Sequence, residues 1–304
     1  MKLQQTLRKS YTFEGKGLHT GRYAHMTINP APEGSGIIFR RTDLPGTPQM
    51  EALSEYVSST ARSTALTCGE CTVGTVEHVL SALTGLGVDN AIIDIDNAEV
   101  PILDGSAAPY CTAILKDGLK VQRVARKYIE LKEEVEIINE KTGSVVRLTP
   151  APKLSYELQI DFNSKVVGVQ TASWAPAVEY SKEVAPCRTF VFFHELEFLL
   201  NNNLIKGGDV DNAIVIVEHP VSEEQIAHVS QLFNKPKLRI DERGYLNNVR
   251  LSFPNECARH KLLDLIGDLR LCGGFLNARV QAVRSGHTIN TNAAKAVREM
   301  LKNN

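Results

Sequence analysis

The sequence predicts an α+β fold built from two similar domains, each a sheet with helices. Short strand-like runs open each half of the chain, and a helix, a strand and a second helix follow them in each half. The length of 304 residues is enough for two domains of ordinary size. We therefore expect a first domain at residues 1–122 and a second at residues 123–304, joined near residues 120–126.

The first half begins with short strands that proline and glycine clusters separate. A helix is expected from Thr75 to about Leu86, with Thr75 as its N-cap, aliphatic residues along one face, and Gly85 and Gly87 at its end. A second helix is expected from Ser106 to Asp117. The expected strands are 24–29, 36–40, 63–67 and 90–96.

The second half repeats this order. Its expected helices are 254–271 and 291–302, and its expected strands are 127–138, 144–148, 154–162, 212–218 and 276–283. An apolar strand–helix–strand insert is expected at about 190–212. Residues 219–248 are polar, and a helix from Glu223 to Leu232 is the one element expected there.

The apolar content of 43% and the charged content of 23% are ordinary for a soluble globular protein. A net charge of -1 gives no basis for binding nucleic acid or an anionic membrane. No apolar run approaches the ~20 residues of a membrane-spanning helix, and the N-terminus lacks the pattern of a secretion signal. We expect a cytoplasmic protein, and a monomer by default.

Cys68 and Cys71 form the one C-x-x-C motif among six scattered cysteines. A zinc knuckle needs a second such pair, and a thioredoxin-like motif needs a strand before it and a helix after it. Gly69 and Glu70 instead suggest the tip of a hairpin. We expect two cysteines that face each other across a turn.

The segment 259–268 carries the strongest chemical signal. In a helix, His260, Asp264 and Asp268 lie one turn apart on one face, beside an apolar stripe. Glu77 and His78 open the first long helix. If the two helices pack together, His78 meets His260 and Asp264, and two imidazoles with one carboxylate are a common ligand set for catalytic zinc.

Simpler explanations exist for each of these residues. A histidine at a helix start is often a surface or capping residue, and an H-x-x-x-D row is often a solvated face or an i,i+4 pair. Spacing alone does not show that His78 and His260 meet.

His287 follows the last expected strand, in Ser285-Gly286-His287, and a loop histidine there is well placed for proton transfer. Asp268 could accept a hydrogen bond from it and favour its charged form. The alternative is a histidine that anchors the loop.

Together these segments closely resemble the zinc-dependent UDP-3-O-acyl-N-acetylglucosamine deacetylase family, which carries out the committed step of lipid A synthesis. The resemblance covers essentially the whole chain. It rests on the blocks at residues 15–22 (GKGLHTGR), 39–45 (FRRTDLP), 75–90 (TVEHVLSALTGLGVDN), 101–110 (PILDGSAAPY), 187–192 (CRTFVF), 207–215 (GGDVDNAIV), 259–269 (RHKLLDLIGDL) and 285–287 (SGH).

The resemblance implies that the helices are sandwiched between two sheets, and it implies a role for each matched residue. The implied zinc ligands are His78, His260 and Asp264. The implied catalytic residues are Glu77 as general base, His287 as the cation that helps protonate the leaving amine, Asp268 as the residue that orients His287, and Thr189 as the hydroxyl that helps hold the oxyanion. The implied substrate contacts are Lys261, Phe190, Phe162, Arg284 and Leu18, with the insert as an apolar passage for the acyl chain.

The implied substrate is a UDP-linked acylated glucosamine, and the implied cofactor is Zn²⁺, with Fe²⁺ in the cell left open. Some relatives carry a C-terminal dehydratase domain, and a fusion of that kind is left open because the chain stops at Asn304. Ser63 stands where some members have a cysteine near the metal. Two other functions remain as alternatives: a metal amidohydrolase of a soluble acetylated sugar, and a non-catalytic binder of the same fold.

Overall fold

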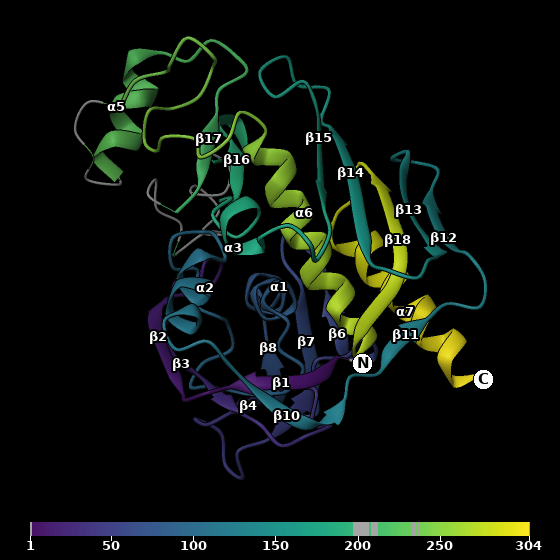
Figure 1. The fold of residues 1–304 in the computed structure, drawn as a ribbon. Helices are drawn as coiled ribbons and strands as arrows, with labels where there is room; N and C mark the ends of the chain where they lie inside the picture. The colour runs from purple at the N-terminus through teal and green to yellow at the C-terminus, as the bar shows by residue number, and fades with distance from the viewer. Residues whose placement is uncertain (1, 197–206, 208–211, 233–234, 236–237, 304) are drawn as a thin grey trace.

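The computed structural model describes residues 2–196, 207, 212–232, 235 and 238–303, and the structural statements below concern these residues. The chain combines several sheets with helices, as the predicted α+β class requires (Figure 1). Among the described residues, no helix has the length and apolar character needed to cross a membrane.

A five-stranded sheet dominates the first half. Its strands, in pairing order, are β2 (Tyr11–Lys16), β3 (Tyr23–Pro30), β9 (Ala91–Ile95), β4 (Ile37–Arg41) and β5 (Gln49–Glu51). A smaller sheet contains β6 (Val57–Ser59), β7 (Ala65–Cys68) and β8 (Cys71–Val73). Cys68 pairs with Cys71 across the β7–β8 turn, which confirms the predicted hairpin.

The second half contains a six-stranded sheet. Its main path is β12 (Val135–Asn139), β13 (Ser144–Pro150), β18 (Phe275–Val283), β14 (Ser155–Asp161) and β15 (Val169–Trp174), and β11 (Tyr128–Glu130) pairs with β18. The expected junction between domains coincides with β10 (Leu119–Ala125), which pairs with β1 (Leu3–Leu7). The division into domains at residue 122 stays a prediction.

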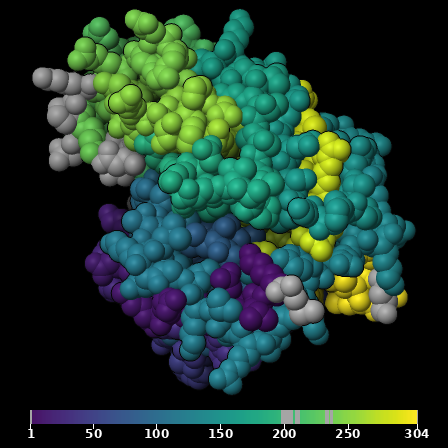
Figure 2. Space-filling model, in the orientation of Figure 1, coloured from purple at the N-terminus to yellow at the C-terminus, as the bar shows by residue number. Residues whose placement is uncertain are grey.

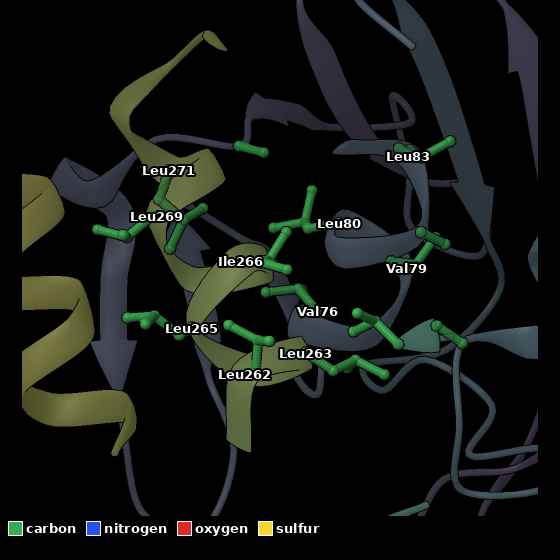
Figure 3. Packing of buried hydrophobic residues seen from close by; sticks show 14 of the residues in the cluster. Val76, Val79, Leu80, Leu83, Leu262, Leu263, Leu265, Ile266, Leu269 and Leu271 are labelled. Carbon is green, nitrogen blue, oxygen red and sulfur yellow. The ribbon is translucent and has the colours of Figure 1, made fainter. Parts of the chain in front are cut away.

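The helices that carry the candidate site lie between these sheets (Figure 1). They are α1 (Glu77–Leu86), α6 (Glu256–Leu269) and α7 (His287–Lys302), and α2 (Ala108–Leu115) packs against α1. Buried aliphatic side chains of α1 and α6 face each other, among them Leu80 and Ile266 (Figure 3). Each such side chain contributes roughly 1.5–3 kcal/mol when fully buried, so the apolar stripes predicted in the sequence hold the two halves together.

Gly267 sets how closely α6 approaches α1. A Cβ at Gly267 would lie 2.0 Å from the carbonyl oxygen of Glu77. Because any larger residue would push the helices apart, glycine is required for this contact. The start of α1 is thereby held against the α6 turn that contains Asp264 and Asp268.

The helices expected from Ser106 and from about Pro254 each begin two residues later, at Ala108 and Glu256, and two other helix starts differ in ways that affect the candidate site. Thr75 is not the N-cap of α1: its backbone is left-handed, with φ of 57°, and its hydroxyl donates to Glu99 at 2.9 Å. The helix begins at Glu77 and ends at Leu86, and Gly87, whose φ is 84°, is its C-cap. The last helix begins at His287 rather than near Thr291, so His287 belongs to a helix N-terminus and not to a loop.

The insert starts as predicted with β16 (Phe190–Phe192), and residues 193–196 are helical. Its parallel partner is β17 (Ile214–Ile216). The second strand expected in the insert, near residues 204–208, lies outside the described residues except for Gly207. The predicted helix at Glu223–Leu232 is confirmed as α5.

Residues around α5 form a small lobe, which is visible at the upper left of Figure 2. The lobe has its own apolar core. The buried members of that core are Phe193, Leu196, Val215, Val217, Val229, Leu238 and Leu246. Since β16 and β17 connect this lobe to the main body, the lobe stands next to the candidate site. The short helix α3 (Tyr180–Glu183) lies between the lobe and α1 (Figure 1).

Candidate metal and catalytic site

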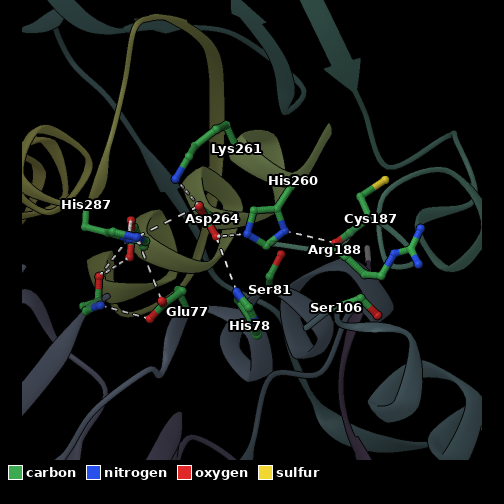
Figure 4. Close-up of polar contacts among 12 residues, drawn as sticks. Glu77, His78, Ser81, Ser106, Cys187, Arg188, His260, Lys261, Asp264 and His287 are labelled. Carbon is green, nitrogen blue, oxygen red and sulfur yellow. Dashed lines mark hydrogen bonds and ion pairs between the residues drawn. The ribbon is translucent and has the colours of Figure 1, made fainter. Parts of the chain in front are cut away.

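His78, His260 and Asp264 converge between α1 and α6, as the sequence hypothesis required (Figure 4). Asp264 Oδ1 lies 3.7 Å from Nε2 of His78 and 3.4 Å from Nε2 of His260. One ligand atom from each of the three lies within 4.8 Å of the others, and all three residues are buried. Two halves of the chain therefore contribute to one donor cluster.

The protonation of this cluster suits a metal ion. Burial lowers the pKa of His78 to about 3 and also lowers the pKa of His260, so both imidazoles are neutral. Nδ1 of His260 lies 3.0 Å from the Cys187 carbonyl oxygen, to which it donates, and this leaves Nε2 free to bind. Asp264 Oδ1 is buried without a hydrogen-bond partner. An unpaired carboxylate oxygen facing two neutral imidazole nitrogens fits a divalent cation.

Glu77 and His287 flank this cluster. Glu77 Oε1 lies 4.0 Å from Nε2 of His287, and Glu77 Oε2 accepts the Thr64 backbone N–H at 3.0 Å. Burial raises the pKa of Glu77 to about 8, which makes this carboxylate a much stronger base than an exposed one.

Asp268 holds His287 on the other side. Asp268 Oδ2 lies 3.0 Å from Nδ1 of His287 and accepts Asn290 Nδ2 at 3.0 Å, while Thr64 donates to Asp268 Oδ1 at 2.6 Å. Burial acts to lower the pKa of His287, but the charges of Asp268 and Glu77 outweigh it and raise the pKa to about 9. His287 is therefore a cation at neutral pH, even at a helix N-terminus.

A pocket contains the cluster and most of the predicted substrate contacts. Its lining residues are Leu18, Arg62, Thr75, Glu77, His78, Phe162, Thr189, Phe190, Phe192, Glu195, His260, Lys261, Asp264 and His287. Lys261 Nζ lies 2.9 Å from Asp264 Oδ2, and Phe162 contacts the rings of Phe190 and Phe192 edge-on. Arg284 does not line this pocket, and its guanidinium pairs with Asp161 at 2.5 Å.

Sequence reasoning missed several groups that shape the site. Thr64 contacts both Glu77 and Asp268. Arg62 and Glu195, which both line the pocket, approach each other to 3.7 Å. The contact between Cys187 and His260 is made by the backbone carbonyl of Cys187, so the type of residue at position 187 does not predict it. Thr64 could have been suspected from the sequence, because it follows Ser63, which stands where some members of the family have a cysteine near the metal.

The fold and the site define an α+β protein with a candidate metal centre at the junction of its two halves. A profile described as UDP-3-O-acyl N-acetylglycosamine deacetylase matches residues 4–238 and 224–299. The chain belongs to this family, as its resemblance predicted.

Curated relatives match over nearly the whole chain. A protein of Porphyromonas gingivalis named bifunctional enzyme LpxC/FabZ is 42% identical over 304 residues, which is 100% of this chain and 66% of the relative. The protein of that name from Bacteroides thetaiotaomicron is 41% identical, over 98% of this chain and 65% of its own length. This chain therefore spans just under two thirds of these relatives.

A relative without a second activity in its name matches along most of its length. The UDP-3-O-acyl-N-acetylglucosamine deacetylase of Citrifermentans bemidjiense is 38% identical, and the match covers 99% of this chain and 90% of the relative.

Proposed function

We propose that this chain hydrolyses the N-acetyl group of a UDP-3-O-acyl-N-acetylglucosamine and releases acetate and the free amine, the committed step of lipid A synthesis. The observation that carries the proposal is the buried cluster of His78, His260 and Asp264 next to Glu77 and His287. Family membership and the name of the Citrifermentans relative supply the substrate.

His78, His260 and Asp264 would hold Zn²⁺, and the same donors also suit Fe²⁺. When bound, the ion lowers the pKa of a water molecule to roughly 7 and polarises a carbonyl. Imidazoles that burial keeps neutral bind it without first losing a proton.

Glu77 is assigned as the general base that takes a proton from the attacking water. Burial raises the pKa of Glu77, so its ionised carboxylate is a stronger base than an exposed one. Thr64 fixes the carboxylate through its backbone N–H, so the accepting oxygen has a defined direction. Thr189, which lines the same pocket, is assigned to the oxyanion.

His287 is assigned as the acid that donates a proton to the leaving nitrogen. It is charged at neutral pH, and Asp268 fixes the ring through Nδ1. Nε2 is then the nitrogen that faces the pocket, 4.0 Å from both Glu77 and Asp264. A base and an acid on one side of the cluster can serve the two proton transfers of amide hydrolysis.

Four residues of the pocket are assigned to the substrate. Phe190 and Leu18 give an apolar wall for the acyl chain, and Phe162 is assigned to the uridine diphosphate end. Lys261, whose ammonium pairs with Asp264, is assigned to a further substrate contact. Contact between Arg284 and the uridine diphosphate also stays a proposal.

The test is acetate release from UDP-3-O-(3-hydroxyacyl)-N-acetylglucosamine, before and after chelation and after Zn²⁺ is restored. We expect activity that depends on both the metal and the acyl chain. Equal turnover of a substrate without the acyl chain would favour a soluble-sugar amidohydrolase instead. Substrate binding without acetate release would favour a non-catalytic binder.

A further inference from the structure

The peptide unit between Cys187 and Arg188 contacts α6 at both of its ends. Nδ1 of His260 donates to the Cys187 carbonyl at 3.0 Å, and the Arg188 backbone N–H donates to Glu256 Oε1 at 3.1 Å. This carbonyl and this N–H belong to one planar, conjugated group. Cys187, Arg188 and His260 are drawn together in Figure 4. Because Glu256 and His260 are four residues apart, they lie one turn apart on the same face of α6.

Glu256 is a fully buried carboxylate with several donors. Its side chain is 0% exposed. The guanidinium of Arg188 approaches Oε1 to 3.0 Å, and the Ser252 backbone N–H donates to Oε2. The charge is therefore compensated and the carboxylate is fixed. Glu256 lines no part of the catalytic pocket, so the mechanism above does not use it.

A histidine that binds a metal usually donates its other ring N–H to a carboxylate or a carbonyl, which fixes the ring and raises its basicity. Here the carbonyl is provided by the peptide unit, and a carboxylate lies at the opposite end of that unit. Hydrogen bonds in series polarise one another, so a charge at the N–H end makes the carbonyl a better acceptor. The hydrogen bond from the Arg188 N–H to the Glu256 carboxylate can thus strengthen the hydrogen bond that His260 donates to the Cys187 carbonyl.

We propose that Glu256 is a positioning residue for the metal centre, acting on His260 through the Cys187–Arg188 peptide unit. The inference rests on the proposed metal site. The same loop continues into Thr189, whose N–H donates to Gly105 at 2.9 Å, so fixing the peptide unit also fixes the residue assigned to the oxyanion.

A second ion pair, between α6 and the last residue of α3, offers a control. Arg259 Nη1 lies 2.8 Å from Glu183 Oε2, and the two side chains are 23% and 44% exposed. Arg259 also donates to the Glu183 carbonyl, which survives a side-chain change. Glu183→Gln therefore removes a charge from the end of α3 and leaves the hydrogen bonds between Glu256, the Cys187–Arg188 peptide unit and His260 in place.

The test is the Zn²⁺ dissociation constant of the whole protein, measured by competition with a chromogenic chelator. Glu256→Gln keeps the size of the side chain and one acceptor oxygen but loses the charge. We expect it to weaken Zn²⁺ binding by about 10-fold or more, and we expect Glu183→Gln to leave binding unchanged. A folded Glu256→Gln protein with wild-type affinity would overturn the proposal. Wild-type protein that binds no Zn²⁺ would overturn the proposed function as well.

The wild-type protein provides a second test if Glu256→Gln does not fold. NMR of the Zn²⁺-loaded protein reports the Arg188 amide proton and the His260 ring nitrogens. We expect a strongly downfield, exchange-protected Arg188 amide proton and a proton on Nδ1 of His260. An unshifted Arg188 amide, or an ion bound to Nδ1, would refute the proposed path.

Discussion

Asp268 Oδ2 lies 3.0 Å from Nδ1 of His287, although Asp268 is in α6 and His287 opens α7. This pair fixes which nitrogen of His287 faces the pocket. It also keeps the ring charged, because Asp268 is the strongest of the neighbours that raise the pKa of His287.

Asp268→Asn should therefore move the basic limb of the pH–rate profile. Burial lowers the pKa of His287, and the Asp268 carboxylate is the largest opposing influence behind the value of about 9. Without that charge the imidazolium loses its proton at lower pH, so kcat/KM should begin to fall at lower pH than in the wild type. The measurement is kcat/KM from pH 6 to pH 10. An unmoved basic limb would mean that another group titrates there.

Glu77→Ala should separate catalysis from metal binding. We expect a loss of kcat on the order of 10²–10⁴-fold, as is typical when a general base is removed, with the metal content unchanged. His78→Ala, one residue away, should lose the metal as well. Elemental analysis and turnover of both variants provide the comparison, and near-normal turnover by Glu77→Ala would remove the assignment of the base.

Gly267→Ala should disturb both stability and catalysis. The new Cβ would meet the Glu77 carbonyl oxygen at 2.0 Å, and overpacking of this kind costs roughly 1–3 kcal/mol. Chemical denaturation measures the change in the free energy of unfolding, and kcat reports the displacement of Glu77. Gly74→Ala is the control, since its Cβ would meet no atom closer than 3.7 Å.

Glu55 should make stability depend on acidic pH. Burial acts to raise its pKa, but hydrogen bonds from Arg298 and Lys302 outweigh this and lower the pKa to about 2. A depressed pKa stabilises the folded state above the unfolded value of 4.5, and this contribution disappears as the pH falls toward 2. Thermal unfolding of wild type and Glu55→Gln should therefore differ at pH 7, and the difference should shrink below pH 4.5 and vanish as the pH approaches 2. A constant difference across this range would exclude the linkage.

Much of the fold could be predicted because its signals are local. The apolar stripe of α6, the hairpin at Cys68 and Cys71 and the helix at Glu223–Leu232 each follow from periodicity or turn chemistry. Thr75 failed as an N-cap because Glu99, from a distant segment, binds its hydroxyl. The sequence predicts too late a start for α7 because Ile289 is the one apolar residue of its first turn, which is too few to show a period.

The arrangement of the site residues in space was harder to predict than their identity. The four-residue spacing in α6 predicted that His260 and Asp264 lie on one face. The approach of His78 depends on how α1 packs against α6, and the close contact at Gly267 that sets this packing leaves no pattern in the sequence. The ion pair between Arg284 and Asp161 connects the loop after β18 to the end of β14, and neither residue type indicates in the sequence which partner it has. The roles of the clustered residues remain predictions that the experiments above address.

The donor cluster draws on both halves of the chain, with His78 in α1 and both His260 and Asp264 in α6. An ion held there would act as a cross-link, and anything that binds the folded state alone protects that state by mass action. Metal supply would then govern how long the protein survives as well as how fast it works. We expect a protease to degrade chelated protein sooner than loaded protein, and equal degradation rates would contradict this coupling.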